Sequence, residues 1–314
     1  MDRPADSPVN DAKNVARGLL MGAADIVPGV SGGTMALILG IYERLVTAIS
    51  HVDLELLGHV RERRWADAFE HADIRFLIAL LAGIGLGVVS LASLMHHLLE
   101  HEMSATFGLF FGLILASSWL VAKLIERWTP AEGVAAILGA IFAFWLTGLV
   151  PAAVDPSYPF VFVSGMVAIC AMILPGISGA FVLLIFGMYY HITGLLKGLA
   201  SGAITTEALL TVVVFGTGCV TGILVFSRVL RFLLERYHSI TMAVLCGFMF
   251  GSLRKIYPFK VEIDFAVDKE FKERIFENVW PWQSPDGILL PVAMMALGIA
   301  VVLLLDRFGK ADVH

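Results

Sequence analysis

Six uninterrupted apolar runs, each about 20 residues long, constrain this chain more than any other feature. They cover residues 74–98, 105–125, 132–150, 208–230, 239–256 and 286–306. A run of this length crosses a bilayer as a single helix. Hydrophobic residues make up 58% of the chain and charged residues only 16%, whereas soluble domains carry about 25% charged residues. We therefore predict an all-α polytopic membrane protein.

Composition and motifs also exclude several functions. A soluble enzyme or a disordered protein would need far more polar surface, and a net charge of −5 offers no basic footprint for nucleic acid. The chain has no GxxxxGK[ST] motif for ATP, so any transport is ion-coupled or downhill. Its three cysteines show neither metal-ligand spacing nor a disulfide framework. Nor do His96, His97 and His101 form a metal pattern, so no metal site, cofactor or catalytic residue is predicted.

Two further apolar stretches are interrupted by Pro and Gly. The stretch 15–49 is cut at residues 28–33, and the stretch 160–199 is cut at residues 175–179. Pro ends a helix and Gly permits a sharp turn, and the roughly 13 residues before the first break make a helix of only about 20 Å. We expect each stretch to be a re-entrant helix hairpin. Its irregular tip must be buried in protein or face a water-filled cavity.

The two interrupted stretches are copies of one another. A shift of 147 residues places Pro28, Gly29, Ser31, Gly32, Gly40 and Tyr42 on Pro175, Gly176, Ser178, Gly179, Gly187 and Tyr189. A shift of 135 residues places Gly83, Gly87 and Gly112 on Gly218, Gly222 and Gly247. We interpret this as a duplication into residues 1–150 and 160–314. Each unit contains one re-entrant hairpin and three transmembrane helices, and the first unit adds a polar segment around residues 51–71.

Because each unit crosses the membrane three times, the second unit must be inverted relative to the first. Lys and Arg, which favour the cytoplasmic side, concentrate in the segments that this topology places inside, with the N-terminus cytoplasmic. The outer loops 99–104 and 151–159 contain none. The mixed-charge segment 252–285 is the exception, and we expect it to cap the outer face. Inverted repeats with broken helices are typical of secondary transporters.

The two breaks are candidate anion sites. The first N–H groups of a helix are unpaired and carry partial positive charge, and nearby Ser and Thr hydroxyls add donors. The candidate substrate-binding residues are Ser31, Gly32, Gly33, Thr34, Ser178 and Gly179. The alternative is that Pro and Gly only form the turn while Ser caps the helix.

Four charged residues near the first break are candidates for ion coupling. Asp25 lies three residues before Pro28 in an apolar run, where a carboxylate is costly and usually functional. It could carry a coupling proton, form a structural pair, with Arg17 on roughly the same helix face, or cap the tip of the opposite hairpin. Glu43 and Arg44, near the hairpin exit, could be functional or an interfacial pair. Arg228, Arg254 and Lys255 flank helix ends, where they could attract a lipid head group or anchor the topology.

The run Leu19–Thr34, continuing to Gly40-Ile41-Tyr42-Glu43-Arg44, resembles the polyprenyl-phosphate transporter family, as does Met172–Gly179 with Gly187-Met188-Tyr189. The resemblance covers nearly the whole chain. It implies a multi-pass bacterial or archaeal plasma-membrane protein. Such a protein returns undecaprenyl phosphate to the inner leaflet, which recycles the lipid carrier for peptidoglycan. The deep carboxylate Asp25 adds the expectation of protons or another ion as coupling partner. The positions that carry over are Asp25, Pro28, Gly29, Ser31, Gly32, Gly33, Thr34, Glu43, Pro175, Gly176, Ser178 and Gly179.

Two rival functions remain. Integral-membrane undecaprenyl-pyrophosphate phosphatases also use inverted repeats, but with a Pro-Gly-x-Ser-Arg-Ser loop. Here Gly32 or Gly179 replaces that Arg, and no ExxxE pair lies in an apolar run. Phosphoryl transfer would therefore lack its charge stabiliser and its base. A secondary transporter of a small anion is the other alternative.

Overall fold

The computed structural model describes residues 7–27, 30–149, 155–202, 204–263, 274 and 276–311. Each of the six predicted spans falls on a helix. The helices α6 (Ile74–His101), α7 (Met103–Lys123) and α12 (Thr206–Arg236) are long and apolar enough to cross a membrane. The helices α8 (Pro130–Leu146), α13 (His238–Ser252) and α14 (Leu289–Ala311) have shorter apolar parts. The prediction of a helical, multi-pass membrane protein is confirmed.

Both interrupted stretches break into three helices. The first contains α1 (Pro8–Ile26), α2 (Gly32–Ile38) and α3 (Tyr42–Ser50), and the second contains α9 (Tyr158–Ile173), α10 (Gly179–Ile185) and α11 (Tyr189–Ala200). In each, the short middle helix packs against the helix before it. The second bend follows at the matched glycines Gly40 and Gly187, whose φ values are +67° and +68°. The bend between α10 and α11 is 112°.

Helix α1 is longer than the apolar run predicts. It has 19 residues and begins in the polar segment at Pro8, where the Ser7 hydroxyl accepts a hydrogen bond from the Asn10 N–H at 3.2 Å. Pro at the first helical position has no N–H to leave unpaired. At 1.5 Å per residue the helix reaches about 28 Å, so the polar residues at its start add about 8 Å to the predicted length.

Four helix pairs build the bundle: α1 with α6, α9 with α12, α7 with α14, and α8 with α13. Glycines spaced four apart let the backbones touch. A Cβ at Gly83 would lie 2.1 Å from the Val15 carbonyl oxygen, and one at Gly218 would lie 2.2 Å from that of Phe162. Close approach through small residues is a main source of helix association in lipid, where no hydrophobic force drives it.

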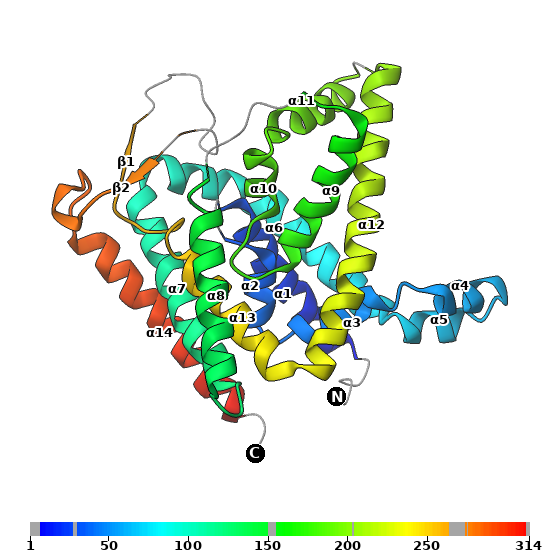
Figure 1. The fold of residues 1–314 in the computed structure, drawn as a ribbon, viewed down its shortest axis with the longest axis horizontal. Helices are drawn as coiled ribbons and strands as arrows, with labels where there is room; N and C mark the ends of the chain where they lie inside the picture. Colours follow the sequence, from blue (N-terminus) through cyan, green and yellow to red (C-terminus); the bar gives the residue numbers. More distant parts are fainter. Residues whose placement is uncertain are drawn as a thin grey trace.

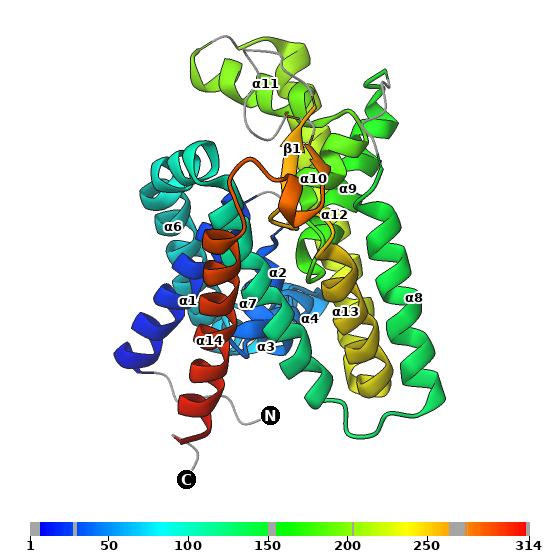
Figure 2. The same cartoon turned by 90° about the vertical axis from the view of Figure 1, so that its left-hand side faces the viewer.

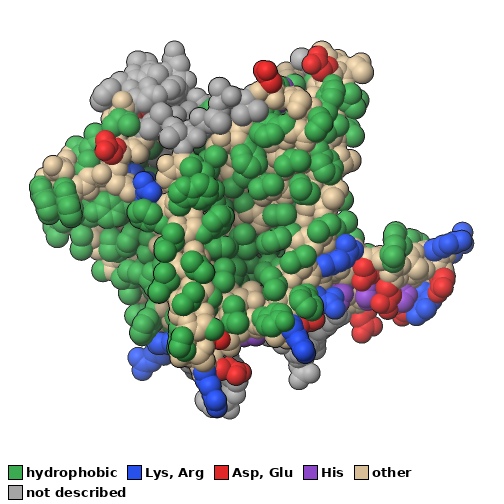
Figure 3. Space-filling view, in the orientation of Figure 1, with side chains coloured by type: hydrophobic (Ala, Val, Ile, Leu, Met, Phe, Trp, Pro, Cys, Tyr) green, Lys and Arg blue, Asp and Glu red, His purple; other side chains and the backbone are tan. Residues whose placement is uncertain are grey.

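The chain termini and the last helices of the two interrupted stretches mark the two ends of the molecule. The start of α1, the end of α14 and helix α3 lie at one end, and α11 lies at the other (Figures 1 and 2). Near the first end, α4 (Leu54–Arg61) and α5 (Trp65–His71) project sideways as a helical hairpin (Figure 1). Apolar side chains cover most of the visible face between the two ends, and charged side chains gather at the ends and on this hairpin (Figure 3). This distribution fits a bundle surrounded by lipid.

A small sheet lies in the segment between α13 and α14. Strand β1 (Lys260–Glu262) pairs antiparallel with β2 (Phe276–Asn278), with Lys260 opposite Asn278. The 3-10 helix η2 (Pro281–Gln283) follows. The all-helical prediction therefore holds for the apolar part of the chain but misses this sheet, because its strands lie in a polar segment without apolar alternation.

Candidate functional site

The two hairpin tips lie against each other, and Val30 and Ile173 next to them belong to an apolar core that also includes Met249. The Ser31 hydroxyl donates to the carbonyl oxygen of Met172 at 3.1 Å and lies 3.4 Å from that of Leu174. In return, the Gly176 N–H donates to Thr34 Oγ1 at 2.8 Å. Each break thus binds polar groups that the other leaves unpaired.

This exchange explains how irregular backbone survives at the centre of an apolar bundle. The last carbonyl groups of α9 and the first N–H groups after it have no partner within their own helix. A buried backbone group without a hydrogen bond costs about 1–3 kcal/mol. Ser31 and Thr34 are fully buried and supply the missing partners across the interface. The two breaks are therefore stable as a pair.

Asp25 caps the first tip from within the same hairpin. Its Oδ1 accepts a hydrogen bond from the Gly32 N–H at 2.6 Å, and the Gly33 N–H donates to Ser31 Oγ at 3.1 Å. The carboxylate is half-buried and lies at the start of α2, where the helix dipole favours negative charge. It therefore occupies the place where the sequence predicts an external anion. The cap that the sequence suggests is on the opposite tip, whereas this hydrogen bond caps the start of α2 in the same hairpin.

Glycine is needed at the tips for space. A Cβ at Gly32 would lie 2.8 Å from Asp25 Oδ2, and one at Gly33 would lie 2.4 Å from the carbonyl oxygen of Ile173. In the second tip, Gly176 has φ +85° and Gly179 closely approaches the carbonyl oxygen of Ala168. Any side chain at these positions would force the two tips or their supporting helices apart.

Ser178 differs from its counterpart Ser31. It stands before the first residue of α10, but its hydroxyl does not cap that helix, and the residue is half-buried. The Ser31 hydroxyl is used in a contact between the tips, whereas the Ser178 hydroxyl does not cap its helix. Pro28 and Gly29, which the family resemblance also brings in, lie outside the described residues.

The other predicted charged residues are placed around the first hairpin rather than at its tip. Arg17 donates to Asn14 Oδ1 at 3.0 Å. Arg44 forms a bidentate ion pair with Asp73, at 2.7 and 3.0 Å, and stacks on Phe76. Glu43 Oε1 lies 3.0 Å from His238 Nε2. These contacts tie the exit of the first hairpin to α6 and to the start of α13.

A basic cluster, formed by Arg254, Lys255 and Lys260, follows the end of α13 beside the second tip. It begins two residues after Ser252, whose hydroxyl would touch a Cβ at Gly176. The Lys255 ammonium lies 4.2 Å from the centre of the Phe181 ring on α10, and the Lys260 ammonium lies 4.3 Å from that of Phe107 on α7.

The electrostatics of this cluster are unusual. The Lys260 ammonium donates to the Lys255 carbonyl oxygen, and no carboxylate of the described residues pairs with either lysine. Burial, followed by the neighbouring Arg254 charge, lowers the pKa of Lys255 to about 8. Burial and the Lys255 charge lower the pKa of Lys260 well below its ordinary value. Lys260 is buried and Lys255 is half-buried, and ammonium groups so placed with only aromatic or carbonyl partners are costly and would be stabilised by an anion.

Sequence reasoning identified part of this cluster. The sequence places Arg254 and Lys255 at a helix end, whereas Lys260 is one of six basic residues in the mixed-charge segment 252–285. The available signal is the spacing of the three residues, which follow directly on an apolar run. The burial of Lys260 depends on β1 folding back toward α7, and the sequence does not display that contact.

Comparison with known proteins agrees with the family resemblance. Residues 21–273 match the model of the undecaprenyl phosphate translocase-like family. The chain belongs to this family. A polyprenyl-phosphate transporter from Vibrio cholerae is 38% identical over 314 residues, covering 98% of this chain and 99% of the relative. A polyprenyl-phosphate transporter from Staphylococcus aureus is 30% identical over 260 residues, covering 78% of this chain and 86% of the relative.

No solved structure matches this member of the translocase-like family. The matched region contains both hairpin tips, Asp25 and the basic cluster. The site therefore lies within the part of the chain that defines the family.

Proposed function

We propose that this chain moves polyprenyl phosphate across the bacterial or archaeal plasma membrane and returns the lipid carrier to the cytoplasmic leaflet for envelope synthesis. The observation that carries this is the placement of an uncompensated basic cluster beside two interlocked hairpin tips. The family membership supports the lipid. A phosphate monoester carries more than one negative charge near pH 7 and cannot cross hydrocarbon unaided, while the isoprenoid tail can remain in lipid.

The head group first meets the basic cluster. Lys255 and Lys260 provide ammonium donors, and Arg254 provides a guanidinium that also binds the Phe144 carbonyl oxygen at 3.1 Å. Phosphate neutralises the repulsion among the three, so binding offsets part of the cost of burying Lys260 and half-burying Lys255. From there the second tip is adjacent through Phe181 and Ser252. The Ser178 hydroxyl and the backbone at Gly179 are then the next donors, followed by Ser31, Gly32, Gly33 and Thr34.

Asp25 couples this movement to an ion. The Gly32 N–H cannot serve phosphate while it donates to the Asp25 carboxylate. Protonation removes the charge from Asp25 and weakens that hydrogen bond, because bonds to charged groups are roughly twice as strong. The phosphate then replaces Asp25 at the start of α2. Proton binding and head-group binding at the first tip are thereby linked.

Opposite orientation of the two repeats provides alternating access. Helix α3 of the first unit and α11 of the second lie at opposite ends of the bundle (Figures 1 and 2). The helix pairs α1–α6 and α9–α12 correspond, as do α7–α14 and α13–α8. Related units of inverted topology can exchange conformations around a shared central site. In this topology both termini are cytoplasmic, and the basic cluster faces outward.

A liposome assay tests the transport proposal. Purified protein is reconstituted with undecaprenyl phosphate, and the fraction of lipid accessible from outside is followed with an impermeant phosphate-binding probe. We expect wild-type protein to equilibrate the two leaflets and Lys255→Gln/Lys260→Gln to slow this strongly. Lys123→Gln is the matched control, because Lys123 also lies over an aromatic ring, that of Trp119, but is exposed.

The same preparation separates transport from hydrolysis. Undecaprenyl pyrophosphate is offered to wild-type protein and to Ser31→Ala, and inorganic phosphate is measured. Release that depends on Ser31 would favour the phosphatase function. Failure of wild-type protein to change lipid sidedness, with folding confirmed, would overturn the proposal.

A further inference from the structure

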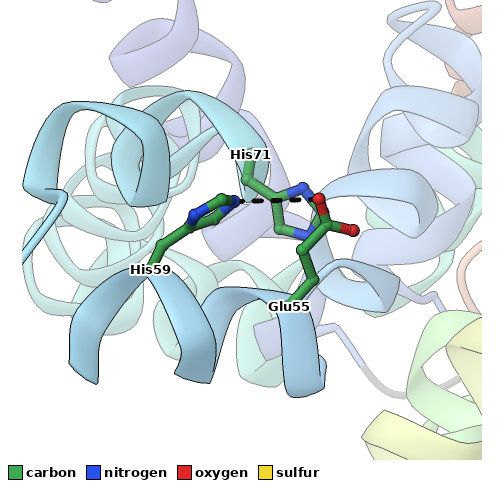
Figure 4. A group of neighbouring side chains, drawn as sticks. All are labelled: Glu55, His59 and His71. Atoms are coloured by element: carbon green, nitrogen blue, oxygen red, sulfur yellow. Dashed lines mark ion pairs between the residues drawn. The ribbon is translucent and has the colours of Figure 1, made fainter. Parts of the chain in front are cut away.

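The projecting hairpin of α4 and α5 brings together three side chains from its two helices. Glu55 and His59 lie one turn apart on α4, and His71 ends α5 (Figure 4). One nitrogen or oxygen from each lies within 4.8 Å of the other two. His59 Nε2 is 3.7 Å from Glu55 Oε1, and the rings of His59 and His71 meet edge to face with centres 5.7 Å apart.

Supporting groups surround these three side chains. Asp53 Oδ1 lies 3.1 Å from His71 Nε2 and holds that ring, as carboxylates commonly do for metal-bound imidazoles. The ring of His51 stacks on His71 with centres 4.7 Å apart, and its Nδ1 is buried without a hydrogen-bond partner among the described residues. Arg64, the nearest arginine in the adjacent hollow, is already paired with Asp67 at 2.6 Å and Glu62 at 3.3 Å.

The donor set fits a borderline divalent metal. Imidazole nitrogens and a carboxylate oxygen bind Zn²⁺ at about 2.0–2.2 Å, which separates tetrahedral ligands by about 3.4 Å. The present spacing must close by no more than about 1.5 Å to reach that geometry. Side-chain rotation suffices, because Glu55 is exposed and His59 and His71 border an open hollow. With three protein ligands, a fourth position remains for water.

We propose that Glu55, His59 and His71 form a binding site for a divalent transition metal, with Zn²⁺ as the best match. Such a metal would link α4 to α5. The hairpin needs a link of this kind, since α4 has no buried residue and α5 buries only Ala68. Two helices of seven and eight residues are too short to be stable alone. The site is separate from the hairpin tips, and it does not depend on the proposed transport activity.

Zinc titration of the full-length, tag-free protein tests this site. Protein in lipid nanodiscs is stripped with a chelator and titrated with Zn²⁺ against a competing fluorescent indicator. We expect one tight equivalent for wild-type protein, and its loss in His59→Gln and in Glu55→Gln. Asp53→Asn should weaken binding by about 10- to 100-fold, as the loss of such supporting carboxylates does elsewhere. X-ray absorption of the zinc-loaded protein should show two imidazole ligands.

Two control variants exclude unspecific binding. Glu62→Gln removes another exposed carboxylate of the same hairpin, and His101→Gln removes a histidine at the far end of α6. Both should keep the tight equivalent. Hydrogen exchange of residues 54–71 should slow on adding Zn²⁺ to wild-type protein and stay unchanged in His59→Gln. No stoichiometric binding by wild-type protein, or equal binding by His59→Gln, would overturn the proposal.

Discussion

Asp25 and Thr34 each accept a hydrogen bond from a backbone N–H group that could otherwise bind an anion. The N–H groups of Gly32, Gly33 and Gly176 all point at side-chain oxygens of the first hairpin. A phosphate must displace one of those oxygens to bind there. Phosphate and the side-chain oxygens therefore compete for the same N–H groups. Substitution of the acceptors Asp25, Ser31 or Thr34 should alter both stability and transport.

Thr34→Ala should destabilise the interlocked tips. It leaves the buried Gly176 N–H without an acceptor, which costs about 1–3 kcal/mol. Thr34→Ser keeps the hydroxyl and should stay closer to wild type. The free energy of unfolding, or the thermal midpoint in detergent, measures the difference. Equal stability of the two variants would mean that the Gly176 contact contributes nothing.

Head-group affinity should fall at alkaline pH through Lys255. Its pKa of about 8 means that the folded, unliganded protein loses this positive charge as pH rises through that value. Bound phosphate raises the pKa, so affinity falls as pH rises past about 8, the value for the unliganded protein, and levels off above the higher pKa of the complex. The lipid phosphate is already mostly doubly charged there, because its second pKa is about 6.

Lys255→Arg separates this charge from other alkaline effects. Arginine stays protonated throughout this range, so the part of the alkaline fall that Lys255 causes should disappear between about pH 7 and about pH 9. Equilibrium binding of undecaprenyl phosphate in detergent is the measurement. A pH profile identical to wild type would exclude Lys255 as its source.

At the scale of elements, glycine contacts decide which helices pair. Gly83→Ala places a methyl group 2.1 Å from the Val15 carbonyl oxygen. It should force α1 and α6 apart at a cost of about 1–3 kcal/mol. Gly85→Ala, two residues along the same helix, meets no atom within 4 Å and should gain up to about 1 kcal/mol from helix propensity. Thermal unfolding of both variants tests the contact, and destabilisation by Gly85→Ala alone would contradict it.

The projecting hairpin should lie on the membrane surface. Its exposed apolar side chains include Leu54, Leu57, Trp65 and Phe69, with exposed fractions of 84%, 62%, 56% and 50%. An amphipathic helix buries such a face at the lipid boundary and leaves its polar face in water. The hairpin is therefore expected to flank the bundle with Glu55 and Glu62 away from lipid.

Spin labels on Leu57→Cys and Glu62→Cys locate this surface. The label at position 57 should collide mainly with oxygen dissolved in the bilayer, and the label at position 62 mainly with a water-soluble nickel complex. Both variants are made in a background without Cys170, Cys219 and Cys246. Equal nickel access at the two positions would place the hairpin in solvent.

For the whole molecule, the inverted topology predicts opposite labelling of two exposed loops. Ser157→Cys precedes α9 and should react with an impermeant thiol reagent on intact cells. Arg63→Cys lies between α4 and α5 and should react only after the membrane is opened. Both residues are exposed. Reaction of both from the same side would reject the inverted arrangement.

The sequence alone determines the helices, the breaks and the family. These depend on properties read locally along the chain: the length of apolar runs, Pro and Gly at the breaks, and matched spacing in two units. The sheet between α13 and α14 and the early start of α1 lie in polar segments, where apolar periodicity gives no signal.

Only the tertiary structure decides how the chemical groups meet. Ser31 reaches Met172 across 141 residues, Lys260 is buried because β1 returns toward α7, and His59 and His71 meet because α4 and α5 fold together. The sequence supplied the residue types for the tips but placed an external anion where Asp25 binds. A local pattern cannot predict such pairings, because the N-terminus of every helix offers unpaired N–H groups. Only long-range packing determines which oxygen accepts from them.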